Sequence, residues 1–387
     1  MKSNVLIYNR EDGLAPTGGP NAVCYYYYKE QKKRNESFFY FLPPNVITTL
    51  NSKKKLFFSK IPDLHLLAAT IKILYLRPHK VKHNLSDYKL IHFHSTDSLF
   101  QARTSLSSYK GIVVLQSHSP EPRGREMFAA LPTWIKVLFP YFKKGFERMD
   151  KYAFQRADYI IFPCVEAEEP YYHTWPFFYN FHVIKPNAFK YVLTGIPQAQ
   201  AKRKRDEVLS EMNIPSEAFI ISYVGRHNQI KGYDNLKEIG KQYLEQDETS
   251  WILCAGREAP LKRLEHPRWK EVGWTNDPHS YIGASDLFIL PNKETYFDII
   301  MMELLSLGKI VIASNTGGNK WFVKHDCPGV FLYNTLDEAI SLINKVKLLS
   351  IKEKESLEAA NRAFYNKYLT VERMYDSYIQ LLKKLLG

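Results

Sequence analysis

The sequence predicts an α/β protein with two doubly wound parallel sheets, one in each half of the 387-residue chain. Short runs of apolar, β-branched and aromatic residues alternate with longer stretches of helical character. Because these runs are apolar throughout, they are typical of parallel strands that are covered on both faces. The pattern pauses over residues 186–216, which are charged, contain Pro and Gly, and are predicted to hold no strand.

The expected strands fall into two sets on either side of that pause. The first set is VLIYN (4–8), FFYFLP (38–43), LIHFHS (90–95), IVVLQSH (112–118) and YIIFPC (159–164), and the second set is FIISYVG (219–225), SWILCAG (250–256), DLFILPN (286–292) and IVIAS (310–314). We therefore place one domain at residues 1–188 and a second at 189–369. Residues 370–387 are predicted to form a strongly periodic C-terminal helix.

The composition indicates a cytoplasmic protein. Hydrophobic residues make up 45% of the chain and charged residues 24%, which is ordinary for a globular protein. The four cysteines form no CxxC pair, which argues against a zinc ribbon or a disulfide scaffold and fits a reducing cytosol. The N-terminus does not look like a signal peptide, and the longest apolar stretch near it, LHLLAATIKILYL, is too short to span a bilayer.

The positive charge is concentrated in the first half. The chain carries +13 overall, and residues 1–188 hold 26 Lys and Arg against 15 Asp and Glu, a net charge of +11. This asymmetry indicates either an anionic partner or a basic surface that aids solubility. No nucleic-acid-binding motif is present, so we expect no nucleic acid. Residues 51–80, with Lys53–Lys55, and residues 134–149 mix lysines with aromatic residues, which suits either a peripheral site at an anionic membrane or amphipathic core helices.

Candidate site residues follow the strands, because ligands of open parallel sheets bind at the carboxyl ends of the strands. Gly18 and Gly19 follow the first strand, where glycines let an anion approach the backbone or simply form a loop. Arg226 and Lys231 lie five residues apart in a loop before a helix, which suits a diphosphate, although solvated surface cations give the same pattern. His118 ends a strand. No DxD, HExxH or His/Cys cluster is present, so we expect no metal.

The stretch KETYFDIIMMELLSLG (293–308) reads as a capped helix. Thr295 is predicted as the N-cap, with Asp298 as its capping-box partner, and Gly308 as the end of the helix. Glu303 is the exception, because a carboxylate within an apolar helical run is costly to bury without a partner. A hydroxyl-rich ligand, a neighbouring backbone group or a basic side chain would each supply one.

These motifs, in this order, resemble the retaining glycosyltransferases of the GT-B fold, family 4 (glycosyl transferases group 1). The resemblance rests on the GG after the first strand, on GRHNQIKG, and on LPNKETYFDIIMMELLSLGKIVIASNTGG. It implies two Rossmann-like domains with an interdomain cleft and a nucleotide-sugar bound mostly by the C-terminal domain. It also implies that the C-terminal helix packs back on the first domain.

The resemblance assigns roles residue by residue. Arg226 and Lys231 would bind the donor diphosphate and stabilise the departing nucleotide. Gly18 and Gly19 would lie near the phosphates and the donor sugar. His118 would lie beside the donor sugar, where the glycosyl bond breaks.

The family's E-x7-E motif is altered in this chain. Glu303 would be its second acid, accepting hydrogen bonds from ribose hydroxyls, but Thr295 stands where the first acid belongs. Eight helical residues bring two side chains to within about 80° of each other, whereas nine place them on opposite faces. Either Glu294 therefore reaches the sugar through a shifted loop, or Thr295 and Asp298 take over its contacts. The family's GGxxE is altered too, with Trp321 in place of Glu.

The resemblance implies a hexosyl- or N-acetylhexosaminyltransferase of bacterial surface polysaccharide or glycoconjugate synthesis. Its donor would be a nucleotide-diphosphate sugar, with UDP expected ahead of GDP, and its acceptor a glycan or a lipid-linked glycan. Neither a metal nor a further cofactor is expected. The alternatives are a catalytically silent partner subunit, a protein-directed glycosyltransferase, and an epimerase or phosphorylase of the same fold. Retention of both Arg226 and Lys231 argues against a silent protein.

Overall fold

The computed structural model describes residues 4–8, 13–16, 19–42, 62–76, 81 and 84–387. The contacts divide the chain into two compact units. Unit 1 comprises Met1–Pro163, Pro170–Val192 and Tyr375–Gly387, and unit 2 comprises Cys164–Glu169 and Leu193–Met374. Unit 1 therefore extends to Val192 rather than ending at residue 188. None of the helices in the described part of the chain combines the length and the apolar composition that crossing a bilayer requires.

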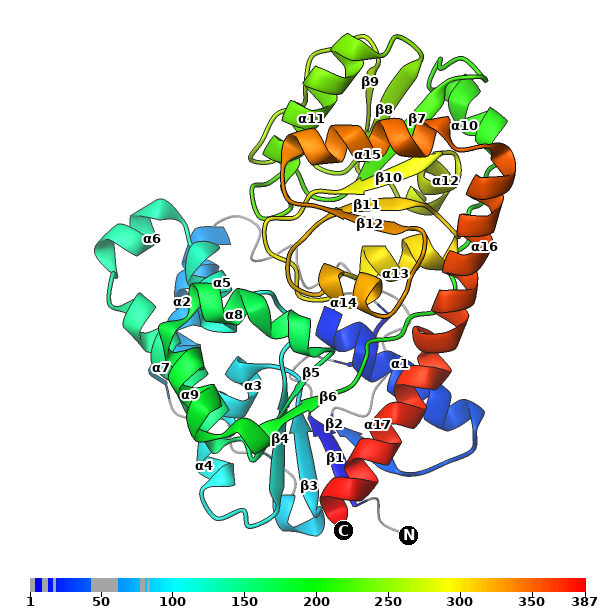
Figure 1. The fold of residues 1–387 in the computed structure, drawn as a ribbon. Coiled ribbons are helices and arrows are strands. Elements are labelled where there is room, and N and C mark those ends of the chain that lie inside the picture. Colours follow the sequence, from blue (N-terminus) through cyan, green and yellow to red (C-terminus); the bar gives the residue numbers. More distant parts are fainter. Residues whose placement is uncertain (1–3, 9–12, 17–18, 43–61, 77–80, 82–83) are drawn as a thin grey trace. The chain divides into compact units, whose positions relative to one another are not determined.

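Unit 1 is built on a six-stranded parallel sheet with the strand order β2-β1-β3-β4-β5-β6. Its strands are β1 (Val5–Tyr8), β2 (Phe39–Leu42), β3 (Leu90–Phe93), β4 (Ile112–Gln116), β5 (Tyr159–Phe162) and β6 (Phe189–Tyr191). The central strands are buried along almost their whole length, as their apolar sequences predict. Figure 1 shows this sheet in the lower part of the picture.

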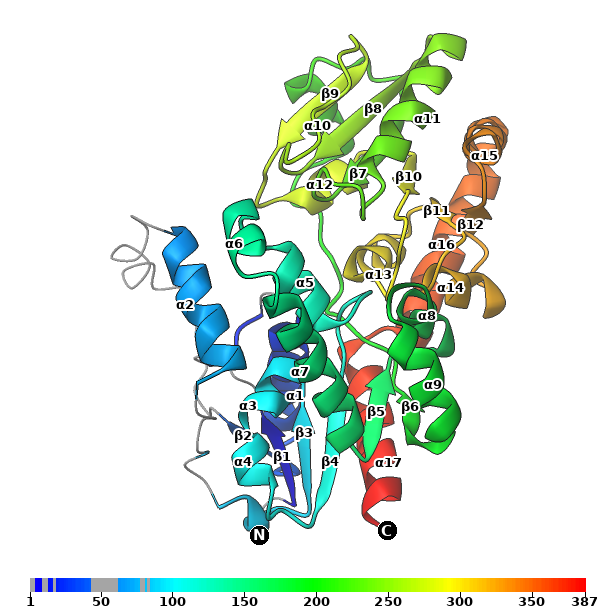
Figure 2. The same cartoon turned by 90° about the vertical axis from the view of Figure 1, so that its left-hand side faces the viewer.

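Helices cover the sheet of unit 1. They are α1 (Gly19–Lys33), α2 (Pro62–Leu74), α3 (Thr96–Gln101), α4 (Arg103–Leu106), α5 (Arg123–Ala129), α6 (Thr133–Leu138), α7 (Phe142–Arg156), α8 (Glu169–Thr174), α9 (Pro176–Ile184) and the end of α17 (Val371–Leu386). Helix α7 packs against α2, α3 and α5, which Figure 2 shows from the side. The part of α17 in unit 1 packs against α1 through Tyr378, whose ring stacks on that of Tyr27 with the ring centroids 4.5 Å apart.

Unit 2 repeats this plan with the strand order β12-β11-β10-β7-β8-β9, again all parallel. Its strands are β7 (Phe219–Val224), β8 (Ser250–Ala255), β9 (Trp269–Gly273), β10 (Leu287–Leu290), β11 (Val311–Ser314) and β12 (Val330–Tyr333). Its helices are α10 (Arg205–Glu211), α11 (Tyr233–Gln246), α12 (Pro278–Gly283), α13 (Ile299–Ser306), α14 (Asn319–Lys324), α15 (Leu336–Leu348) and α16 (Ile351–Tyr368), and α17 begins in this unit.

The nine expected strands are all present, but three further strands in the described part of the chain were missed. The prediction that residues 186–216 hold no strand is wrong, because β6 lies there and pairs with β5. The other two are β9 and β12. All three are edge strands of their sheets. Strands β6 (FKY) and β9 (WKEVG) are interrupted by charged residues and lack the continuous apolar run that marked the others, whereas β12 (VFLY) has such a run and was overlooked.

Candidate functional site

The loop between β7 and α11 (residues 225–232) carries the two cations that the sequence singles out. The side chain of Asn228 accepts a hydrogen bond from the N–H of Lys231 through Oδ1 (2.9 Å). The hydroxyl of Tyr223 donates to the carbonyl of Arg226 (3.0 Å). These bonds fix the backbone of the loop, so both cationic side chains start from defined positions.

Gly232 lets this loop pack directly on the loop that follows β10. Its φ of +64° lies in the left-handed region, and a Cβ there would lie only 1.7 Å from the carbonyl oxygen of Pro291. The N–H of Lys293 donates to the carbonyl of Ile230 (3.0 Å), which joins the two loops again. Both conditions select glycine at position 232.

The two cations differ in their surroundings. Lys231 Nζ lies 2.7 Å from Asp298 Oδ2, and the same carboxylate oxygen also accepts a hydrogen bond from the buried side chain of Asn292. Arg226 is exposed and makes no ion pair with any residue that the structure describes. One cation is thus held in place by an acid, while the guanidinium of the other remains available to an anion.

The predicted capping box is wrong. Helix α13 begins at Ile299, with Asp298 at the N-cap position, and the Asp298 side chain makes no bond to the N–H groups of the helix. Its carboxylate is directed to Lys231 and Asn292 instead. The predicted end of the helix is confirmed, because Gly308 follows the C-cap with a φ of +79°.

Thr295 lies inside unit 2. Its side chain is fully buried, and its hydroxyl accepts a weak hydrogen bond from Asn319 Nδ2 (3.4 Å). Its carbonyl accepts a bond from the N–H of Gly318 (3.1 Å). Thr295 therefore joins the loop after β10 to the loop after β11.

Glu303 is less buried than the sequence predicts. Its side chain is 25% exposed, and Oε1 lies 3.4 Å from Nε2 of His279 on α12. Glu294, which is half-buried, and Thr295 both precede α13, so the helical-wheel comparison of eight and nine residues does not apply to them. A carboxylate that remains partly exposed beside the loop–helix junction can still accept hydrogen bonds from a ligand.

The altered GGxxE motif has a packing explanation. Trp321 is 6% exposed and lies among the rings of Phe297, Phe364 and Tyr368. A carboxylate from another segment nevertheless reaches the loop between β11 and α14. Glu169 accepts a hydrogen bond from the N–H of Gly317 (3.1 Å) and also pairs with Lys320.

A buried polar cluster supports the loop of residues 225–232, which we call the cation loop. The ring of His227 is fully buried and stacks on Tyr233, with centroids 3.8 Å apart. Glu271 Oε2 lies 3.7 Å from His227 Nε2, while Oε1 accepts bonds from Tyr233 and Trp269. Burial lowers the pKa of His227 and raises that of Glu271, and the stacked rings and the hydrogen bonds to Glu271 support the loop by packing.

His118 lies in unit 1 and is bonded to a second histidine. His94 Nδ1 and His118 Nε2 are 2.9 Å apart, and the ring centroids are 5.2 Å apart with planes 17° from parallel. The distance between the two ring centroids equals the N–N distance plus one ring radius on each side. Both nitrogens therefore lie on the line that joins the centroids, and the hydrogen bond lies in the plane of the two rings. Burial lowers the pKa of His118 to about 3, so its ring is neutral at pH 7 and Nδ1 is the nitrogen left for a ligand.

Gly19 begins helix α1 of unit 1, and Gly18 lies outside the described residues. A Cβ at Gly19 would meet nothing within 4 Å in the described part of the protein. Packing against the described residues therefore does not require a glycine at position 19.

The structure thus brings Lys231, Asp298 and Asn292 together in unit 2, with Arg226 on the same loop. His118 and Gly19 belong to unit 1. Sequence reasoning missed Asn292 and His279. A polar residue two positions after the end of β10 was a signal for Asn292, whereas no pattern in the sequence marked His279.

The chain resembles known proteins in its sequence and in its fold. Residues 218–350 match the family model of glycosyl transferases group 1. The UDP-Gal:alpha-D-GlcNAc-diphosphoundecaprenol alpha-1,3-galactosyltransferase of Escherichia coli is 30% identical over 115 residues, which cover 29% of this chain and 30% of that protein. The lipopolysaccharide 1,2-N-acetylglucosaminetransferase of Salmonella typhimurium is 24% identical over 205 residues, covering 48% and 52% of the two chains. The chain thus spans about a third to a half of the length of these relatives.

A solved structure extends the likeness to the whole chain. HepE of Anabaena, in complex with UDP-glucose, has a TM-score of 0.62 at 13% identity, and the alignment covers 98% of this chain and 99% of that one. At this identity the likeness concerns the fold. The protein therefore has the GT-B fold of two Rossmann-like units, and residues 218–350 of its second unit are similar to the glycosyl transferases group 1.

Proposed function

We propose that the protein is a retaining glycosyltransferase that moves a hexose or an N-acetylhexosamine from a nucleotide-diphosphate sugar to a glycan or lipid-linked acceptor. The reaction would belong to bacterial surface polysaccharide or glycoconjugate synthesis. The family of unit 2 and the names of the two bacterial relatives support this class of reaction. A uridine nucleotide is the expected donor, because the Escherichia coli relative is named for UDP-Gal and the HepE complex holds UDP-glucose.

The observation that carries the proposal is the meeting of two loops in unit 2. The cation loop places Lys231 against Asp298, the residue at which α13 begins. Arg226, from the same loop, has no acid to neutralise it among the described residues. A helix N-terminus, a fixed ammonium and an open guanidinium together suit a diphosphate, because Arg binds phosphate oxygens in pairs and the helix dipole favours an anion.

The proposed chemistry needs no protein nucleophile. As the glycosyl bond breaks, negative charge develops on the leaving nucleotide diphosphate, and Arg226 and Lys231 stabilise it there. The acceptor hydroxyl attacks from the face that the leaving group vacates, and a phosphate oxygen takes its proton, so the anomeric configuration is retained. Glu303 accepts hydrogen bonds from the ribose hydroxyls, and the neutral ring of His118 bonds the donor sugar through Nδ1. No metal is required.

The donor is tested by thermal unfolding with a panel of UDP- and GDP-sugars, with and without EDTA. A UDP-sugar at 100 times its Kd should stabilise the fold by about 2.7 kcal/mol, because only the folded state binds it. We expect at least one UDP-sugar to raise the Tm, with the same shift in EDTA. No shift with any nucleotide-sugar would sink the donor site. A donor that binds but is neither transferred nor hydrolysed would favour the silent-partner alternative.

We also propose that unit 1 docks on an anionic membrane surface, where a lipid-linked acceptor would lie, which makes the protein a peripheral one at the cytoplasmic face. Residues 43–61, with Lys53–Lys55, lie outside the described residues. The other segment that mixes lysines with aromatic residues, residues 134–149, supports the proposal. Helix α6 buries Ile135 but leaves Val137 70% and Leu138 64% exposed, beside the half-buried Lys136. Apolar side chains exposed next to lysines suit an anionic interface.

Vesicle binding tests this surface. Val137→Ser together with Leu138→Ser should weaken binding to acidic vesicles by about tenfold or more, because two apolar side chains no longer enter the interface. Val183→Ser together with Ile184→Ser is the matched control, since these neighbours on α9 are 64% and 77% exposed in the same unit. Sedimentation with vesicles at two salt concentrations measures both. Equal binding to neutral and acidic vesicles, or equal loss in both double variants, would contradict the proposal.

A further inference from the structure

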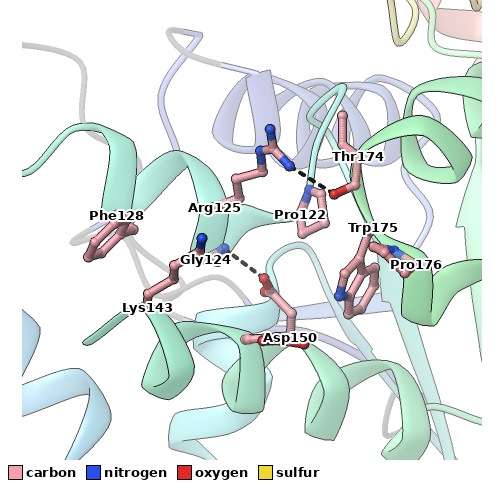
Figure 3. Close-up of a pocket in the computed structure, with 10 residues that line it drawn as sticks. Pro122, Gly124, Arg125, Phe128, Lys143, Asp150, Thr174, Trp175 and Pro176 are labelled. Carbon is pink, nitrogen blue, oxygen red and sulfur yellow. Dashed lines mark hydrogen bonds between the residues drawn. The ribbon is translucent and has the colours of Figure 1, made fainter. Parts of the chain in front are cut away.

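Unit 1 contains a cavity of about 290 Å³ that none of the roles proposed above uses. It lies between α5, α7 and the turn from α8 to α9, as Figure 3 shows. Its lining residues are Pro122, Gly124, Arg125, Phe128, Lys143, Glu147, Asp150, Thr174, Trp175 and Pro176.

The closed side of the cavity is formed by a fixed carboxyl group. Asp150 is 1% exposed and accepts hydrogen bonds from the hydroxyl of Thr96 (2.6 Å) and from the N–H of Gly124 (2.9 Å). A Cβ at Gly124 would lie 2.7 Å from Asp150 Oδ2, so the glycine permits this approach. Burial raises the pKa of Asp150 to about 7, and Asp97 and Arg123 act on it with opposite signs. The carboxyl group therefore carries only part of a charge near neutral pH.

The donors of the cavity come from Arg125, whose side chain is 57% exposed but makes two contacts. Arg125 Nε lies 2.8 Å from an oxygen of Glu121, and Arg125 Nη1 donates to the carbonyl of Thr174 (2.8 Å). These contacts occupy two of the five N–H groups of the guanidinium and neutralise its charge, while the other N–H groups remain for a ligand. The guanidinium is thus pre-organised to donate hydrogen bonds rather than to attract an anion.

The rest of the lining is balanced in charge and partly aromatic. Lys143 and Glu147 lie one helical turn apart on α7, and both are exposed. Figure 3 shows the rings of Phe128 and Trp175 at opposite ends of the cavity. A phosphate would find two carboxyl groups and no excess of cations, and a wholly apolar ligand would cover the remaining N–H groups of Arg125 without pairing them. A neutral ring with hydroxyls on its edge and C–H groups on its faces satisfies both kinds of wall.

We propose that this cavity binds one neutral sugar unit of the acceptor glycan, next to the unit that reacts. This inference rests on the proposed function. Pro122 follows His118 by four residues, so their Cα atoms lie at most ~14 Å apart. That distance is within reach of neighbouring units of one oligosaccharide, with one unit in the cavity and the reacting hydroxyl near His118. The cavity therefore selects acceptors that carry a sugar behind the reacting one.

The experiment measures sugar binding without catalysis. The probes are the methyl glycosides of glucose, galactose and N-acetylglucosamine and disaccharides of the same sugars, followed by saturation-transfer NMR on the full chain. Arg125→Ala removes the fixed donors, and Thr174→Phe fills the cavity. We expect at least one neutral probe to bind, and its Kd to rise at least tenfold in each variant. UDP binding, which depends on unit 2, should remain within twofold of the wild-type value.

Arg123→Ala is the matched control. Arg123 lies on the same helix and pairs with Glu126, but it does not line the cavity, so probe binding should stay within twofold. If Thr174→Phe does not fold, Arg125→Ala carries the test. The proposal is overturned if no neutral probe binds, if the Kd is unchanged in the folded variants, or if inorganic phosphate displaces the sugar. Any of these results together with intact UDP binding would contradict the sugar cavity but not the proposed donor site. If the wild-type protein does not bind UDP, the donor site is contradicted instead.

Discussion

Arg226→Ala and Lys231→Ala are each expected to lower kcat/KM for sugar transfer ~10²-fold, the scale for removing one group that stabilises charge in a transition state. The two losses have different origins. Arg226 makes no ion pair with a described residue, so its removal leaves no acid unpaired and measures the guanidinium alone. Removing Lys231 also leaves Asp298 without its cation, although Asn292 still donates to that carboxylate.

Arg226→Lys and Lys293→Ala separate geometry from charge. Arg226→Lys keeps the charge but not the paired donors, so we expect it to recover only part of the activity. Lys293 is a cation on the adjoining loop that pairs with Asp234, and its loss should change kcat/KM by no more than about twofold, as is usual for an exposed pair. Initial rates with the donor found by thermal unfolding provide the measurement. Equal losses in Lys293→Ala and Arg226→Ala would show that only the general charge of the surface matters.

Gly232→Ala is expected to destabilise unit 2 and to disturb the cation loop. Placing Ala at a φ of +64° costs about 1–2 kcal/mol by itself. The added Cβ would also lie 1.7 Å from the carbonyl oxygen of Pro291, so the two loops must separate, at a further ~1–3 kcal/mol for an overpacked site. Because Lys231 and Asn292 are the neighbours of these two residues, their contacts with Asp298 should weaken as well.

Gly273→Ala is the matched control for this prediction. Gly273 also has a positive φ, +74°, but a Cβ there would meet nothing within 4 Å. It should therefore show only the backbone cost, with UDP affinity unchanged. The midpoint of thermal unfolding and the Kd for UDP are the two measurements. A similar drop in Tm for both variants, or UDP binding that Gly232→Ala does not weaken, would mean that the contact with Pro291 does not hold the loop.

The sequence located most of the residues of the candidate site but not their partners. Arg226, Lys231 and Asp298 were all found, because loops after buried strands and the starts of helices are recognisable from the chain alone. The pairing of Lys231 with Asp298 was not found. It depends on β10 lying beside β7 in the sheet, which brings together loops that are more than sixty residues apart.

The start of α13 shows how tertiary contacts override a local pattern. Thr295 and Asp298 have the spacing of a capping box, and a local reading favours a helix that begins after Thr295. In the folded unit Thr295 is buried against Asn319, and Asp298 bonds to Lys231 and Asn292. Lys231 and Asn319 come from other segments, and Asn292 comes from the start of the same loop. These partners compete with the helix for both side chains, so the helix begins at Ile299.

The sequence by itself determined that this protein has two parallel sheets, where nine of their strands lie, and which loops carry the cations. Those features depend on apolar runs and glycines that act locally along the chain. The tertiary structure alone decided the edge strands β6 and β9, the partial exposure of Glu303 beside His279, the bond between His94 and His118, and the cavity beside Asp150. Each of these depends on which strands and helices become neighbours, and the spacing of residues along the chain does not fix that.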